Sequence, residues 1–146
     1  MKLKQLRSKD VNKELEPFNI SLNKKDSVQL REDGIILVNN KPHFFYYEQK
    51  IVPTLHFLQE RIVLPTITVD MGAIKFVING ADIMRPGITE ISEGIKKDSF
   101  IVVIDQNNHK PLAVGIALLG TEEMKSATSG KVVRNIHYVG DWIWKI

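Results

Sequence analysis

Residues 72–89 read GAIKFVINGADIMRPGIT, an apolar run punctuated by three glycines and one proline, with Lys75, Asp82 and Arg85 as its charged side chains. Glycines let a ligand backbone approach main-chain amides, and cations neutralise phosphates. The segment RPGI at 85–88 also fits a type II turn, in which proline fixes the second position and glycine takes the positive φ of the third. These residue types predict a seat for a sugar-phosphate chain, with exposed main-chain donors beside Lys75 and Arg85.

The same residues also fit a structural interpretation. Gly80 and Gly87 are typical of helix ends and turns, where geometry alone requires glycine. Gly72 and Gly115 are typical of glycines that allow close packing. The two cations fit solvated surface charges, and Asp82 favours a turn, because a carboxylate repels phosphate.

Two aromatic groups have a bearing on binding. Trp142 and Trp144 lie two residues apart in a predicted strand, so they share a face that can stack bases at about 1–3 kcal/mol per base. Burial of at least one of them is the competing interpretation. The run FFYY at 44–47 alternates between faces, so two rings are expected in a core and two outward, covered by a helix or a partner.

Enzyme chemistry finds little support in the sequence. The four histidines are scattered, no cysteine accompanies them, and no phosphate-binding loop, serine-hydrolase or dinucleotide motif is present. His137 and Asp141 form the one pair close in sequence, and with no nucleophile beside them they predict a structural hydrogen bond. We therefore expect no enzyme activity, no metal and no cofactor.

The charge of the chain is unevenly distributed. Residues 1–64 hold 11 Lys or Arg against 8 Asp or Glu, whereas residues 65–146 hold 9 of each, which accounts for the net charge of +3. A nucleic acid on the second half would therefore be held by a few placed charges. The basic start of the chain predicts a solvated tail, or a contact with a nucleic acid. Its cations are Lys2, Lys4, Arg7 and Lys9.

Composition places the chain among globular proteins. The absence of cysteine favours a reducing cytoplasm. No run approaches the roughly 18 apolar residues of a membrane span, and the basic first residues are not followed by the apolar core of a secretory signal.

The first half predicts a helix, a sheet and a second helix. Ser8 fits an N-cap before a short amphipathic helix, and residues 26–52 fit a small antiparallel sheet. Pro53 suits the first position of the second helix. The residues expected on the inner faces of the two helices are Val11, Leu15, Phe18, Leu55, Leu58 and Ile62. Pro65 favours extended geometry before it, so a domain boundary is expected at residues 63–66.

The second half predicts a small, nearly closed barrel. Residues 100–105 and 111–119 form a hairpin of continuously apolar strands, which is typical of burial on both faces, with Gly115 at a bend. Asp70 is expected to cap a helix that Gly80 ends, and Thr121 to start another. Residues 131–139 and 141–146 supply closing strands. The expected inward stripe of the capped helix is Ala73, Ile74, Val77, Ile78 and Ala81.

The segments VDMGAIKFVINGADIMRPGIT, PLAVGIAL and NIHYVGDWIW together resemble the PUA domain. The preceding PTLHFLQERIVLP resembles the end of the pre-PUA domain of the malignant T-cell amplified sequence family, in its archaeal form. The resemblance implies an α+β protein, with a pre-PUA domain at residues 1–64 and a PUA pseudobarrel of mixed strands and short helices at 65–146.

In that family the PUA domain binds RNA, so the resemblance implies recognition of tRNA or small-subunit rRNA in translation or RNA maturation. The implied partners are structured RNA, the small ribosomal subunit and a translation factor, without a membrane. The alternative is a protein-interaction module that docks a translation factor through the N-terminal domain. The residues expected to contact RNA are Lys75, Asn79, Gly80, Ala81, Arg85, Pro86, Gly87, Trp144 and Lys145.

Overall fold

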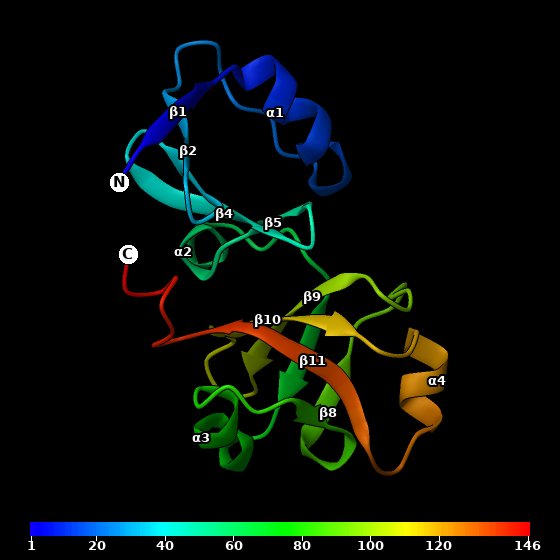
Figure 1. The fold of residues 1–146 in the computed structure, drawn as a ribbon. Helices are drawn as coiled ribbons and strands as arrows, with labels where there is room; N and C mark the ends of the chain where they lie inside the picture. Colours follow the sequence, from blue (N-terminus) through cyan, green and yellow to red (C-terminus); the bar gives the residue numbers. More distant parts are fainter. The chain divides into compact units, whose positions relative to one another are not determined.

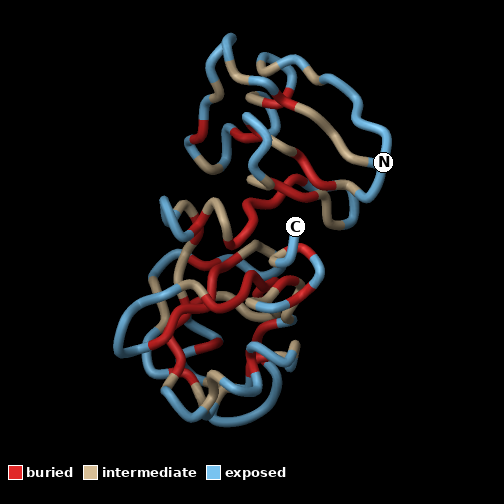
Figure 2. Tube along the Cα trace, turned by 90° about the vertical axis from the view of Figure 1, so that its left-hand side faces the viewer, coloured by how far each residue is buried: buried red, intermediate tan, exposed pale blue.

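The computed structural model describes all residues 1–146. The chain divides into two compact units, one formed by Met1–Val63 with Ile146 and the other by Leu64–Lys145, and each is described by itself (Figure 1). Buried residues are concentrated in the strands of each unit (Figure 2). No helix is both long enough and apolar enough to cross a membrane.

The first unit is a five-stranded antiparallel sheet whose strands pair in chain order, β1-β2-β3-β4-β5. Its strands are β1 (Leu3–Leu6), β2 (Val28–Arg31), β3 (Ile35–Val38), β4 (Lys41–Tyr47) and β5 (Lys50–Pro53). Its helices are α1 (Ser8–Leu15), the 3-10 turn η1 (Glu16–Phe18) and α2 (Leu55–Glu60). The core joins Val11 and Leu15 of α1 to Val28, Ile36 and Phe44 of the sheet. The predicted helix–sheet–helix order is confirmed.

Several details of this unit differ from the prediction. The basic start of the chain is an edge strand, β1, because Leu6 packs against the core and β2 supplies hydrogen-bonding partners. Arg7, not Ser8, is the N-cap of α1, and no side chain caps it. The second helix is capped by Thr54, whose hydroxyl accepts the amide of Phe57 at 3.2 Å. The helix ends at Glu60, so Ile62 lies beyond it and is exposed.

The β4–β5 turn offers a test of local strain. Its two central residues, Glu48 and Gln49, have φ of 47° and 68°, although neither type favours positive φ. Replacing them by Asn and Gly is expected to raise the free energy of unfolding by about 1 kcal/mol, because those residues adopt the turn without strain. Thermal melting followed by circular dichroism measures it. Asn40→Ala, in the equivalent β3–β4 turn, is the control and should lower stability, because alanine does not favour the positive φ of that position. If both variants lost stability, the turn residues Glu48 and Gln49 would not be strained.

The second unit is a six-stranded, nearly closed pseudobarrel of mixed strands with short helices, as predicted, and its strand order is β7-β11-β10-β9-β6-β8. Its strands are β6 (Thr66–Val69), β7 (Ile83–Met84), β8 (Ile88–Ile91), β9 (Phe100–Asp105), β10 (Pro111–Ala117) and β11 (Lys131–Tyr138). Its helices are η2 (Met71–Ala73), α3 (Ile74–Val77), η3 (Arg85–Gly87) and α4 (Thr121–Ser126). The β6–β9 pair is parallel and the other pairs are antiparallel.

Apolar side chains fill the interior of this sheet. Ile101 and Val103 of β9 and Ala113 of β10 are fully buried, and Met124 of α4 joins the same cluster. Gly115 lies where the register of β10 and β11 shifts, so the predicted bend is confirmed. The predicted closing strand at 141–146 is wrong, since β11 ends at Tyr138 and turns follow it.

Candidate functional site

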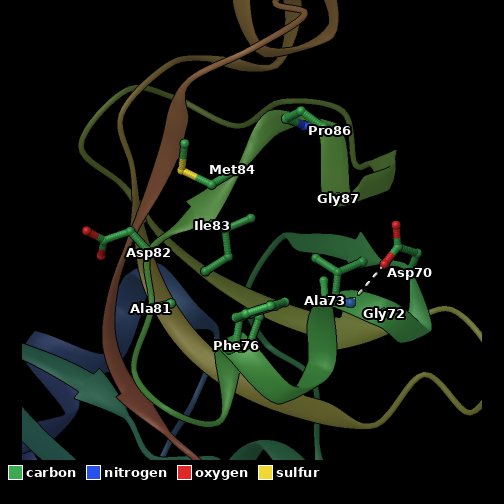
Figure 3. Close-up of a pocket in the computed structure, with 12 residues that line it drawn as sticks. Asp70, Gly72, Ala73, Phe76, Ala81, Asp82, Ile83, Met84, Pro86 and Gly87 are labelled. Atoms are coloured by element: carbon green, nitrogen blue, oxygen red, sulfur yellow. Dashed lines mark hydrogen bonds between the residues drawn. The ribbon is translucent and has the colours of Figure 1, made fainter.

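A groove of about 510 Å³ opens at the segment singled out in the sequence (Figure 3). It lies among the end of β6, the η2–α3 segment, β7 and η3. Its walls are almost entirely apolar, and Phe76 and Met84 keep 58% and 50% of their surface exposed. The lining residues that the site depends on are Asp70, Ala73, Phe76, Asp82, Met84 and Gly87.

Phe76 lies on the exposed face of the short helix α3. The helix has only four residues, Ile74–Val77, and of these only Val77 is buried. The predicted inward stripe is therefore wrong at Ile78 and Ala81, which lie beyond the helix and are exposed. The sequence carried one signal for the groove, since Phe76 is a large apolar residue outside the predicted stripe.

Asp70 fixes one end of the groove. Its Oδ1 accepts the amide of Ala73 at 2.9 Å, which confirms the predicted cap (Figure 3). Its own amide donates to the carbonyl of Gly87 at 2.9 Å. The end of β6 is thereby tied to both η2 and η3, and the two walls are held at a fixed separation.

Gly80 ends the helical segment in the left-handed region, with φ of 88°, as predicted. Its amide donates to the carbonyl of Val77 at 3.0 Å. A Cβ at this position would lie 2.9 Å from the ring of Tyr138, so glycine is required by packing as well as by conformation.

The type II turn predicted at residues 85–88 is wrong. These residues form a 3-10 turn in which the amide of Ile88 donates to the carbonyl of Arg85, and Gly87 does not have a positive φ. A Cβ on Gly87 would lie 3.4 Å from the Cβ of Ala73 across the groove. Because Gly87 has no side chain, η3 can lie close to η2 at this point.

Arg85 is directed away from the groove. Its Nε donates to the carbonyl of Met124 at 2.7 Å and its Nη1 to the carbonyl of Ile88 at 3.3 Å, so it satisfies a carbonyl in the last turn of α4. Lys75 is exposed, with its Nζ 5.1 Å from the ring centroid of Phe76. Neither cation lines the groove, and the structure does not bring the two together there.

The expected free main-chain donors are also largely absent. The amides of Gly80, Ala81 and Arg85 donate to the carbonyls of Val77, Phe76 and Gly130 at 3.0, 3.0 and 2.8 Å. Asn79 donates its side-chain amide to the carbonyl of Lys75 at 2.8 Å. The prediction that exposed amides beside two cations make up the site is therefore wrong, because the turn uses these amides internally.

Asp82 is, with Asp70, one of the two charged residues that line the groove. Its Oδ1 accepts the amide of Asn135 at 2.9 Å, and its Oδ2 pairs with Nζ of Lys131 at 2.8 Å. Burial raises the pKa of the Asp82 carboxyl, but the bonds from Lys131 and Asn135 outweigh it and hold the pKa below its usual value. The groove thus has two carboxylates and no cation in its lining, and one of the carboxylates, Asp82, is paired with Lys131 at the edge.

The C-terminal aromatic residues are placed by Asp141. Its Oδ2 accepts the Nδ1 proton of His137 at 2.8 Å and the amide of Tyr138 at 3.0 Å, and its Oδ1 accepts the amide of Trp144 at 2.9 Å. The predicted structural hydrogen bond is confirmed. Trp142 is 55% exposed and Trp144 is half-buried, so the two rings do not form the predicted face of a strand.

Comparison with known proteins agrees with this fold. Residues 65–139 match the PUA domain family, and residues 3–61 match a domain of unknown function (DUF1947). The chain is a PUA-domain protein.

Similar proteins define the family more narrowly. A protein of Methanocaldococcus jannaschii is 44% identical over an aligned length of 144 residues, and the alignment covers 93% of this chain and 89% of that protein. Translation machinery-associated protein 20 of Saccharomyces cerevisiae is 36% identical over 128 residues (82% and 67%), and malignant T-cell-amplified sequence 1 of Rattus norvegicus is 34% identical over 142 residues (89% and 77%). The chain belongs to the malignant T-cell-amplified sequence family.

Solved structures show the same architecture. A hypothetical protein from Pyrococcus horikoshii, 35% identical, superposes with a TM-score of 0.85 over 99% of this chain and 98% of that one. A chain of an H/ACA RNP bound to a substrate RNA is 25% identical and superposes with a TM-score of 0.53, over 68% of this chain and 31% of that one.

Proposed function

We propose that the protein binds RNA through a PUA domain at residues 65–146, and that a pre-PUA domain at residues 1–64 accompanies it in translation. The observation that carries the proposal is the match of residues 65–139 to the PUA family. A chain of similar fold belongs to an RNP bound to a substrate RNA, and a relative is named a translation machinery-associated protein. The expected targets are tRNA or small-subunit rRNA, with the small ribosomal subunit as the setting, in the cytoplasm.

The shape and chemistry of the groove suit an unpaired base. Phe76 presents an exposed ring, and stacking a base on an aromatic side chain contributes about 1–3 kcal/mol. The Lys75 ammonium lies over one face of that ring, which leaves the other face for the base, and it can neutralise the adjoining phosphate. Asp82 disfavours a phosphate inside the groove, which leaves the apolar walls for the base. Since an A-form duplex hides its base edges in a deep major groove, we propose that a loop or an unpaired end enters.

We propose that the nine residues predicted from the sequence to contact RNA form part of the binding surface, in two roles. The exposed members approach the RNA, and the half-buried members shape the surface. The exposed members are Lys75, Asn79, Ala81, Pro86 and Lys145, and the half-buried members are Gly80, Arg85, Gly87 and Trp144.

The alternative function is a module that docks a translation factor through the N-terminal domain. The first unit exposes less aromatic surface for such a partner than the sequence predicts. Phe44 and Phe45 of β4 are both buried. Tyr46 donates its hydroxyl to the Glu14 carboxylate at 2.9 Å, and burial together with this bond raises the pKa of Tyr46 to about 12. We therefore propose RNA as the ligand. We also propose that the protein has no catalytic activity, since the His137–Asp141 pair makes a structural hydrogen bond.

The proposal predicts that Phe76→Ala weakens binding. Loss of one stacked base corresponds to a Kd increase of about 5- to 150-fold. The melting temperature should not change, because Phe76 is largely exposed. Fluorescence anisotropy with labelled bulk tRNA, and sedimentation with small ribosomal subunits, measure the binding.

Ile62→Ala is the matched control, since Ile62 is another exposed apolar residue, in the first unit, and its removal should leave binding unchanged. Arg85→Glu is a poor test, because it removes two internal hydrogen bonds and is expected to lower stability. Equal affinity of Phe76→Ala and wild type would remove the groove from the proposed function.

A further inference from the structure

The basic start of the chain is an ordered surface. β1 pairs with β2 from Leu3↔Arg31 to Leu6↔Val28, and α1 follows it directly (Figure 1). This segment carries a group of exposed cations, none of which forms an ion pair, and which we call the β1–α1 basic surface. Its members are Lys2, Lys4, Arg7, Lys9 and Lys13.

The helical part of this surface faces solvent. Val11 and Leu15 are buried, and by the helical period Lys9 and Lys13 lie on the opposite face. Glu14 is on a flank of the helix, where its carboxylate accepts the hydroxyl of Tyr46 at 2.9 Å. The Glu14 carboxylate is thus turned toward β4. The solvent face of α1 carries the two lysines, with the exposed Asp10 as the other acid of the helix.

Lys4, in the strand part of this surface, lies on the side of the sheet that α1 covers. Leu6 packs in the core cluster that contains Val11 and Leu15 of α1. Because side chains alternate along a strand, Lys4 is on the face of Leu6, and its pairing partner Leu30 packs against the same cluster. Lys at an edge strand also prevents edge-to-edge pairing. That role does not account for Lys9 and Lys13, which are on a helix.

We propose that the β1–α1 basic surface is a second RNA contact, which holds the phosphate backbone of RNA. The inference rests on the proposed function. Lysines bind phosphate as point charges and read no sequence, so this surface adds affinity and salt dependence.

The distribution of charge favours RNA as the occupant. The half that carries the groove holds 9 cations and 9 acids, so the net excess available for counterion release lies in residues 1–64, with 11 against 8. An acidic protein would use the same charges but would not need the groove.

The test is a triple variant, Lys4→Gln, Lys9→Gln and Lys13→Gln, against labelled bulk tRNA at several salt concentrations. Each lost phosphate contact removes about 0.7–0.9 from the slope of log K against log salt, so the slope should fall by about 2–3, with at least a tenfold loss of affinity at low salt. The matched control is Lys96→Gln, Lys97→Gln and Lys110→Gln, three exposed lysines of the second unit, which should keep the wild-type slope. Melting temperatures should stay unchanged in both.

The outcomes separate this inference from the proposed function. An unchanged slope in the triple variant, while Phe76→Ala still loses affinity, overturns the basic surface alone. A reduced slope with unaffected binding by Phe76→Ala supports the basic surface and removes the groove. Loss of binding to polyglutamate with unchanged binding to tRNA assigns the surface to an acidic protein and overturns the inference. Wild-type protein that binds neither tRNA nor small ribosomal subunits overturns both.

Discussion

Replacing Gly115 by alanine is expected to lower the free energy of unfolding of the second unit by about 3 kcal/mol, because there is no space for a Cβ at this position. A Cβ built on Gly115 lies 2.8 Å from the carbonyl oxygen of Arg134, and the side chain of Val133 is also in contact with it. The carbonyl belongs to the backbone of β11 and cannot rotate away as a side chain does. Gly115 also lies at the register shift, so the variant must separate the strands or undo the bulge.

Urea denaturation followed by tryptophan fluorescence measures this effect, since Trp142 and Trp144 are both in the second unit. Gly72→Ala is the control. A Cβ on Gly72 would meet only Oδ1 of Asp70, at 3.5 Å, and its φ is not positive, so a change of less than about 0.5 kcal/mol is expected. Equal stability of the two variants would show that the strands accommodate a methyl group at Gly115 without cost.

The elements predicted correctly are those whose signal is local. The apolar residues of β9 and β10 run without interruption, and the short loop between them fixes an antiparallel pair. Asp70 stands immediately before a helical segment, where its carboxylate has an amide donor within three residues. Neither feature depends on contacts between distant parts of the chain.

The errors arise where distant contacts decide the structure. Arg85 was interpreted as a free cation, but its main acceptor is the carbonyl of Met124, 39 residues away. β1 was interpreted as a tail, because Leu6 is its only side chain that packs in the core and the partner strand begins at Val28. No local pattern contains either contact.

The groove was missed for a related reason. The helical period was extended to Ala81, whereas α3 ends at Val77 and Gly80 then reverses the chain. The sequence predicts a binding site made of the main-chain amides and cations of residues 72–89. In the structure, the same segment forms an apolar groove with Phe76 and Met84 exposed at its rim. A large apolar residue outside the expected stripe was the available signal.

Replacing Asp141 by alanine is expected to cost about 3 kcal/mol or more, because it leaves several hydrogen-bond donors without an acceptor, and each buried unsatisfied donor costs about 1–3 kcal/mol. The donors are Nδ1 of His137, which is fully buried, and the amides of Tyr138 and Trp144. Tryptophan fluorescence reports directly on this turn. Asp10→Ala, at an exposed aspartate of α1, should change stability by less than about 0.5 kcal/mol.

The ionisation of Asp141 gives the same interaction a pH dependence. Burial raises the pKa of this carboxyl, but the bonds from His137, Trp144 and Tyr138 outweigh it and hold the folded-state pKa below its usual value. A carboxyl with a depressed folded-state pKa contributes stability above its unfolded pKa of about 3.9, and that stability is lost as pH falls through the folded-state pKa. The difference in unfolding free energy between wild type and Asp141→Asn should therefore be largest near pH 6 and shrink toward pH 3. Other acids titrate equally in both proteins and cancel, so a difference that stays constant over this range would show that the charge of Asp141 does not stabilise the turn.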